Sequence, residues 1–386
     1  MENLPLYFDY AATTPVDERV IDVMVKCLGA SGNFGNPASS SHRYGQQARQ
    51  AVELARAQVA GLVGARAEQL VWTSGATESN NLALKGLAQG RKGGHIITSR
   101  IEHKAVLDTA RQLQDAGFED TYLTPDANGL ITPRAVLAAL RADTFLVSLM
   151  LVNNELGTLT DVAAIGEIVR RHGALLQVDA AQAAGKVSID LGRWPVDVVS
   201  FSAHKVYGPK GIGALYVGDR ARPLLQAQIH GGGHEGGLRS GTLATHQIAG
   251  MGAAFALAAQ VQDDELARIR CLRQRLLEQL RDVSGLTLNG SAEQSIPHTL
   301  SLTFAGDSLD LSVLGATLAF SSTSACNSGS SAPSHVLLAL GHDEYLASQT
   351  IRLSLGRFTA EADVDLAAQA IRAALRPAPF WGVARG

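Results

Sequence analysis

Cysteine is scarce in this sequence, which has only three among 386 residues: Cys27, Cys271 and Cys326. They stand far apart, so they match neither the spacing of a metal site nor a disulfide framework. We therefore expect no metal centre, and the lack of a disulfide framework favours a reducing compartment, the cytoplasm.

The sequence also lacks an excess of either charge and any long apolar run. Lys plus Arg number 33 and Asp plus Glu 36, and this balance gives no reason to expect a nucleic-acid partner. The densest basic stretch, residues 268–275, follows a helical pattern and is interpreted as a solvated face. No apolar run reaches transmembrane length and residues 1–9 lack the features of a secretory signal, so no membrane association is expected.

From about residue 50 to 260, the sequence alternates between strand and helix patterns. Between the strands lie amphipathic helices, of which Val162–His172 is the clearest, with Asp161 as its N-cap and Gly173 as its stop. This alternation predicts an α/β fold with a largely parallel sheet covered on both faces. The predicted strands are residues 69–73, 95–98, 144–152, 174–178, 197–201 and 213–217.

After about residue 260 the pattern changes. A long helix is predicted over 265–283, followed by an alternating strand at 299–304 and a final helix near 364–375. We expect a large domain over residues 15–260 and a smaller α+β domain made of residues 1–14 and 261–386. The smaller domain carries a run of small residues, 321–331, that contains Cys326.

Lys205 has the sequence context that most favours chemistry. It follows an apolar run that ends in small and polar residues, and it precedes a glycine-rich turn. Its amine is therefore predicted to lie at the end of a buried strand, where it would suit Schiff-base formation with an aldehyde cofactor. The segment alone does not decide the matter, because most lysines are solvated surface groups.

Four further segments place polar groups where strands end, which is where ligands bind in open α/β sheets. Ala76 and Thr77 begin a helix after a glycine turn, which suits either a phosphate or an ordinary helix cap. Asp179 could pair with a pyridinium nitrogen or cap the next helix, and Gln182 could reach the phenolic oxygen of the same ring.

The other two segments are centred on His103 and Asn154. His103 could stack on a flat cofactor or simply cap its own helix. Asn154 could hydrogen-bond the ring or the substrate, although paired asparagines before a glycine also form turns. Each segment is weak alone, and their combination points to a single cofactor site.

In this order, the segments resemble the cysteine desulfurases of the NifS/IscS type, which are class V, fold-type-I pyridoxal phosphate enzymes. The resemblance runs from Phe8 to Thr359 and implies a mostly parallel seven-stranded sheet in the large domain. The matching motifs are residues 73–81, 102–104, 152–157, 178–182, 200–205, 239–242 and 324–326.

The resemblance also implies a role for each candidate residue. Lys205 would bind pyridoxal 5'-phosphate as a Schiff base and His103 would stack on its ring. Asp179 would hold the ring nitrogen, and Gln182 the phenolic oxygen. Asn154 would contact both cofactor and substrate.

Other residues would hold the phosphate and the substrate. Arg352 would clamp the substrate carboxylate, a task that suits a planar bidentate donor. Thr242 would reach the phosphate from the other subunit, which implies a homodimer. The remaining phosphate ligands would be Ala76, Thr77, Ser202 and His204.

The three cysteines differ in their surroundings. Cys27 lies on an apolar helical stripe and is predicted to be buried, whereas Cys271 lies off the stripe of its helix and is predicted to be exposed or marginal. Cys326 lies among small residues that have little to bury, so we expect a mobile loop. By resemblance its thiolate attacks the sulfur of L-cysteine, with His103 as a candidate base, and yields L-alanine and a persulfide. The sulfur would then pass to an acceptor such as an iron–sulfur scaffold protein.

Several alternatives stay open. A selenocysteine lyase would use the same cofactor without depending on Cys326, and a sulfur carrier or scaffold paralogue would not be catalytic. A fold-type-I aminotransferase has no need of a cysteine on a loop.

Three features depart from the family pattern: Ala203 replaces a usual glycine, Gly236 replaces a common arginine, and the tail over 376–386 differs from the one that helps dock scaffold proteins.

Overall fold

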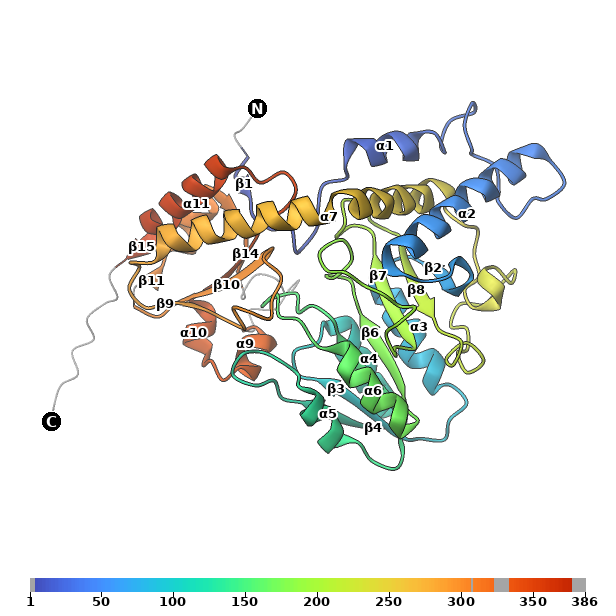
Figure 1. Cartoon of the computed structure of the whole chain (residues 1–386), viewed down its shortest axis with the longest axis horizontal. Coiled ribbons are helices and arrows are strands. Elements are labelled where there is room, and N and C mark those ends of the chain that lie inside the picture. The colour runs from blue at the N-terminus through green and yellow to red at the C-terminus, as the bar shows by residue number, and fades with distance from the viewer. Residues whose placement is uncertain (1–3, 307, 323–332, 377–386) are drawn as a thin grey trace.

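The computed structural model describes residues 4–306, 308–322 and 333–376. Its largest sheet has seven strands in the order β2-β8-β7-β6-β5-β3-β4 (Figure 1). Only β8 runs antiparallel to its neighbours, which confirms the mostly parallel sheet. The strands are β2 (Leu70–Thr73), β3 (His95–Ser99), β4 (Glu119–Leu123), β5 (Thr144–Met150), β6 (Leu175–Asp179), β7 (Val198–Ser202) and β8 (Gly213–Val217).

Helices cover both faces of this sheet because successive strand side chains point in opposite directions. In β5, Leu146 packs in the cluster that contains α3 and α4, whereas Val147 packs in the cluster that contains α2 and α6. The helices of this part are α1 (Glu18–Val25), α2 (Arg43–Val63), α3 (Ala76–Ala88), α4 (Lys104–Asp115), α5 (Pro133–Ala139) and α6 (Val162–His172). The predicted caps of α6 are confirmed: Asp161 accepts from the Ala164 N–H, and Gly173 adopts φ +96°.

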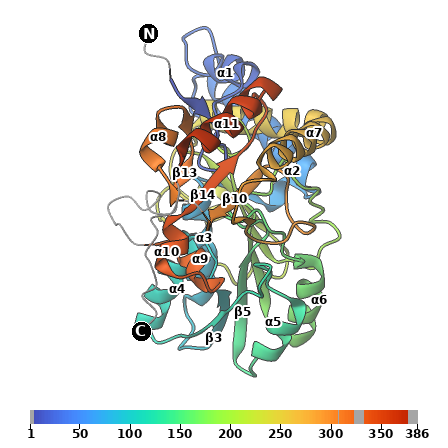
Figure 2. The ribbon, with the colours of Figure 1, turned by 90° about the vertical axis from the view of Figure 1, so that its left-hand side faces the viewer.

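A second, four-stranded sheet has the order β13-β14-β10-β9 and is entirely antiparallel (Figure 2). Its strands are β9 (Leu286–Leu288), β10 (Thr299–Phe304), β13 (Ser321–Ser322) and β14 (Thr350–Ser354). Two small ladders pair β1 (Leu6–Tyr7) with β12 (Leu318–Ala319), and β11 (Ser308–Leu309) with β15 (Leu375–Arg376). The helices around it are α8 (Leu311–Gly315), α9 (His335–Ala339), α10 (Glu344–Ser348) and α11 (Glu361–Ala374).

The helix α7 (Thr245–Leu280) spans 36 residues and connects the regions of the two sheets (Figure 1). The sequence predicted only its second part, over 265–283, where the apolar residues keep to one side. The first part is rich in alanine and glycine and packs against α1 and α2. Because it is buried around most of its circumference, it has no single apolar stripe to detect. No helix among the described residues is long and apolar enough to cross a membrane.

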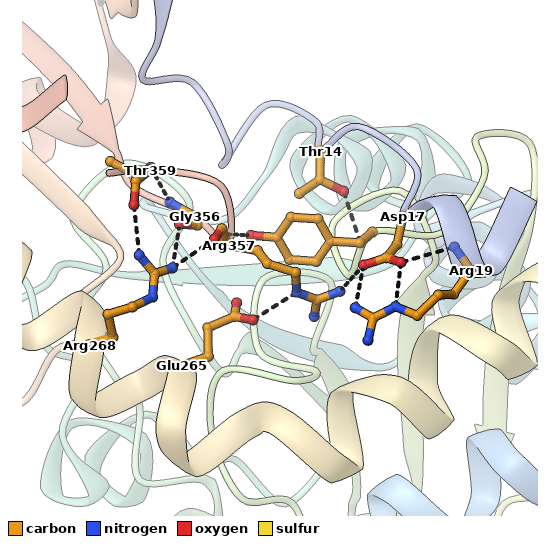
Figure 3. A network of polar contacts seen from close by, with 9 residues as sticks. Thr14, Asp17, Arg19, Glu265, Arg268, Gly356, Arg357 and Thr359 are labelled. Carbon is orange, nitrogen blue, oxygen red and sulfur yellow. Dashed lines mark hydrogen bonds and ion pairs between the residues drawn. The ribbon is translucent and has the colours of Figure 1, made fainter. Parts of the chain in front are cut away.

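A network of charged side chains joins the N-terminal segment, α7 and the segment after β14 (Figure 3). Arg357 donates from Nε to Glu265 at 2.9 Å and from Nη1 to Asp17 at 3.0 Å. Its guanidinium carbon lies 4.0 Å from the ring centroid of Tyr207. Arg268 also donates to the Thr359 carbonyl, so the basic stretch interpreted as a solvated face in fact contributes structural contacts.

Candidate active site

A cavity of about 530 Å³ lies beyond the carboxyl ends of β5, β6 and β7. The structure therefore brings together nine of the predicted site residues. Thr242 and Arg352 do not line this cavity, and Cys326 lies outside the described residues. The nine are Ala76, Thr77, His103, Asn154, Asp179, Gln182, Ser202, His204 and Lys205.

Lys205 follows β7, and its amine donates to the carbonyl of Ala11 at 3.0 Å. Burial lowers the pKa of this amine to about 8, and the nearby charge of Arg352 acts in the same direction. A lowered pKa raises the fraction of neutral amine, the form that attacks an aldehyde. The residue thus has the burial and the basicity that a Schiff-base lysine needs.

Asp179 is the last residue of β6 and is only 5% exposed. Its Oδ2 accepts from Nδ2 of Asn80 at 2.8 Å, and its Oδ1 accepts from the Ala181 N–H at 2.9 Å. Asn80 in turn accepts from Gln177 at 2.9 Å, and Gln177 accepts from the hydroxyl of Ser148. This buried chain of hydrogen bonds fixes the orientation of the carboxylate.

Asn80 was not among the predicted site residues, although it lies within the 73–81 motif. We expect Asn80→Ala to reduce the free energy of unfolding by about 1–3 kcal/mol, because it leaves Asp179 and Gln177 each short of a buried partner. Urea unfolding measures this loss. Asn81→Ala is the matched control, since Asn81 bonds to the Thr77 carbonyl at the surface and the change should alter stability by at most about 0.5 kcal/mol. Equal losses in the two variants would contradict the prediction.

The N-terminus of α3 forms one end of the cavity. Its cap, Gly75, has φ +153° and offers no side chain, so the first backbone N–H groups of the helix are left for an anion. A Cβ on Gly213 would lie 2.7 Å from the Gly75 Cα, so a side chain at that position of β8 would displace this turn. His204 also lines the cavity; its Nδ1 bonds to Thr13 at 3.1 Å, and burial lowers the pKa of its ring to about 4.

His103 caps α4, one of the two roles considered from the sequence, and its side chain also lines the cavity. Its Nδ1 accepts from the Ala105 N–H at 3.1 Å. The pKa of the ring is lowered, chiefly by desolvation. A neutral ring whose Nδ1 accepts must carry its proton on Nε2, so it offers a donor at that nitrogen.

The preceding residue, Glu102, is 1% exposed, and burial raises the pKa of its carboxyl to about 8. Its Oε1 accepts from Ser99 at 2.6 Å, whereas its Oε2 has no hydrogen-bond partner among the described residues. A pKa of about 8 favours the protonated form of this carboxyl at neutral pH.

The side chain of Gln182 binds the same backbone carbonyl as Lys205, that of Ala11 in the N-terminal segment. Nε2 of Gln182 donates to the Ala11 oxygen at 2.8 Å, and its Oε1 accepts from Lys186 at 3.1 Å. Neither partner could be predicted from the sequence, because Ala11 contributes only its backbone carbonyl and Lys186 lies beyond the motif. Only the fold brings residues 11 and 205 together.

Arg352 projects from β14 and is 7% exposed. It donates to the carbonyl of Asn154 at 3.0 Å and pairs with Asp9 at 2.7 Å. Its Nε has no partner within the described part of the chain. The Asn154 carbonyl thus ties the arginine to the rim of the cavity. The neighbouring Asn153 forms the turn, because its Oδ1 accepts from two backbone N–H groups.

Two of the three cysteines can be placed. Cys27 is 6% exposed, as predicted, and Cys271 is exposed on α7. Neither lines the cavity. No described cysteine is therefore positioned to react with a ligand there.

Comparisons with known proteins agree with this architecture. The class-V aminotransferase family model matches residues 6–366. Cysteine desulfurase IscS from Pseudomonas putida (strain GB-1) is 57% identical over 388 residues, covering 98% of this chain and 96% of the relative. A solved NifS-like protein superposes with a TM-score of 0.88 at 35% identity, and the match covers 96% of this chain and 99% of the NifS-like chain.

A second solved structure, SspA in complex with cysteine, superposes with a TM-score of 0.81 at 40% identity. It covers 92% of this chain and 100% of its own. The family match, the relative and the fold confirm the resemblance seen in the motifs. The chain therefore belongs to the class-V aminotransferase family, within which it is a cysteine desulfurase of the NifS/IscS type.

Proposed function

We propose that this chain takes sulfur from L-cysteine, releases L-alanine and holds the sulfur as a persulfide on Cys326. The observation that carries the proposal is the single cavity in which the low-pKa amine of Lys205, the buried carboxylate of Asp179 and the ring of His103 meet. The complex of the related SspA with cysteine supports this choice of substrate.

The residues around the cavity fit pyridoxal 5'-phosphate, the cofactor of this family. A cavity of about 530 Å³ suits a small cofactor with an amino acid. The uncapped start of α3 at Gly75 suits the phosphate together with Ser202 and His204, and the buried Asp179 suits a cationic ring nitrogen. Bound there, the cofactor supplies an electron sink for charge that develops at the Cα of the amino acid.

The protein's own groups then have distinct tasks. Lys205 holds the cofactor and later moves the proton at the substrate Cα, which a neutral amine with a pKa of about 8 can accept near neutrality. Asp179, oriented by Asn80, keeps a negative charge opposite the ring nitrogen. Gln182 donates to the phenolic oxygen, and Arg352 binds the substrate carboxylate beside Asn154, using its unpaired Nε.

Sulfur transfer is the task assigned to Cys326. Its thiolate attacks the substrate sulfur, the carbon–sulfur bond of the substrate breaks, and that carbon takes up a proton as alanine forms. An ordinary thiol has a pKa of about 8.5, so the thiolate needs stabilisation at neutral pH. The cap bond at Nδ1 of His103 leaves Nε2–H as its free group, which favours hydrogen bonding to the thiolate over removal of the thiol proton.

We also propose a homodimer, in which Thr242 reaches the phosphate site of the other copy, and an acceptor such as an iron–sulfur scaffold. Thr242 is exposed and outside its own cavity, which supports this assignment. The proposed domains are residues 15–260, and residues 1–14 with 261–386. A hydrophobic cluster that combines Phe8 with residues between 269 and 374 supports this division, and α7 runs across the boundary.

A single-turnover assay with L-cysteine tests the proposal, with alanine and protein-bound persulfide as readouts. We expect Cys326→Ala to form no persulfide and to release alanine at least about 100-fold more slowly. Cys271→Ala is the control, because that exposed thiol lies on α7 away from the cavity, and it should behave like the wild type. Persulfide on the Cys326→Ala protein would refute the assignment, and undiminished release of selenide from selenocysteine by this variant would favour a lyase.

A further inference from the structure

Lys186 is a buried lysine that the proposed reaction does not use. It lies after β6, is 9% exposed, and donates from Nζ to Oε1 of Gln182 at 3.1 Å. Burial lowers the pKa of its amine to about 7. A lysine is rarely placed in such surroundings without a specific partner, because removing an ammonium group from water is costly.

Two partners set which way the amide of Gln182 points: the amine of Lys186 and the backbone carbonyl of Ala11. A lysine amine in its charged form can only donate, so it must face Oε1. Nε2 is then directed to the other side, where it donates to the Ala11 carbonyl at 2.8 Å. The amine of Lys205 donates to this same carbonyl at 3.0 Å. Lys186, Gln182, Ala11 and Lys205 therefore form one continuous hydrogen-bonded chain.

The charged groups around Lys186 come from several elements. Lys205, which follows β7, and Arg352, on β14, lower the pKa of the Lys186 amine, whereas Glu265 on α7 raises it. Lys186 in turn lowers the pKa values of His204 and His298. The amine thus adds to the positive potential on the Lys205 side of the cavity.

We propose that Lys186 is a positioning residue, which holds the Gln182 amide with its N–H toward the cofactor's phenolic oxygen. The inference rests on the proposed function and deepens it. With the cofactor bound, an N–H donated to that oxygen would draw electron density away from the nitrogen by which Lys205 holds the cofactor, and so away from the proton on that nitrogen. Lys186 therefore makes this proton easier to lose, both through Gln182 and through its own charge.

The test is a pH titration of the absorbance of the bound cofactor in Lys186→Met. We expect the midpoint to move upward by about 0.5–1 pH unit, the effect of losing one hydrogen bond. Lys186→Arg keeps a charged donor and should restore most of the wild-type midpoint. Lys92→Met is the matched control, because Lys92 is an exposed lysine in the loop before β3, and its midpoint should equal that of the wild type.

A Lys186→Met protein that titrates like the wild type would overturn the inference, because a purely structural lysine would alter stability without moving the midpoint. If Lys186→Met does not fold, Lys186→Leu replaces it, since its apolar side chain also removes the donor and should give the same upward shift. In a protein that already carries Gln182→Met, Lys186→Met should shift the midpoint less, because much of the shift depends on the side-chain amide of Gln182. A wild type that binds no cofactor at Lys205 would instead refute the proposed function.

Discussion

Lys205→Ala is expected to reduce alanine release from L-cysteine by at least about 10³-fold, because it removes both the covalent attachment of the cofactor and the group that moves the Cα proton. The fold should survive. The substitution deletes an amine whose burial disfavours its charge, so the variant should unfold at no lower urea concentration than the cofactor-free wild type.

The pKa of Lys205 also sets a pH dependence. With a value of about 8 instead of the ordinary 10.5, the neutral fraction at pH 7 is about 300-fold larger. Attachment of the cofactor to the cofactor-free protein should accelerate as pH rises toward about 8 and then level off. The folded protein releases this proton before the unfolded chain does, so the amine's contribution to stability also rises between about pH 8 and 10.5.

Borohydride reduction followed by peptide mapping measures the attachment directly. The wild type should carry the reduced cofactor on Lys205, and the alanine variant should carry none. Lys186 is the other buried lysine nearby, so a label found on Lys186 in the wild type would show that the wrong amine has been assigned.

Arg357→Met is expected to lower the free energy of unfolding by about 3–5 kcal/mol. The arginine is buried between Asp17 and Glu265, whose side chains are 4% and 10% exposed. Asp17 keeps a bond to Arg19, but Glu265 loses the partner it has in this network (Figure 3). A buried carboxylate left without its cation is the main source of the loss.

Urea unfolding of the single and double variants measures this effect. Adding Glu265→Gln to Arg357→Met should restore part of the lost stability, because the second change removes the uncompensated charge. Arg275→Met is the control, since that arginine pairs with Asp365 at the surface, where such pairs contribute about 1 kcal/mol or less. A loss at position 357 no larger than that at position 275 would contradict the prediction.

The sequence was most informative where one local pattern decides a structure. Six of the seven strands of the large sheet and the helix α6 were predicted within a few residues, because their apolar periodicity and caps are local. The strand β4 was missed, since Glu119–Leu123 lies at the sheet edge and is largely half-exposed. Its polar residues give no buried-strand pattern, although its backbone still pairs with β3.

The same limit applies to the site. Lys205, Asp179 and His103 were predicted because each lies at or just after the end of a strand, so local sequence placed them at the same edge of one sheet. Asn80 was missed because only the tertiary fold makes it a neighbour of Asp179, 99 residues later. Lys186 was missed because it lies beyond the motif that contains Gln182, although the two residues are only four positions apart. Arg352 was predicted as a site residue only from the resemblance to a family, because a lone arginine on a strand does not indicate a function.

The position of the first residues has a consequence for how the protein is made. Ala11 is held by a bond from its N–H to Ser354, 343 residues later, and β1 pairs with β12. At a synthesis rate of about 5–20 residues per second, the ribosome delivers the second partner roughly 20–70 seconds after the first. The large sheet can form in that interval, but the Ala11 carbonyl that Lys205 and Gln182 share is fixed only after Ser354 has been synthesised. The nascent chain thus assembles its cofactor cavity last, which delays cofactor capture until both sheets exist.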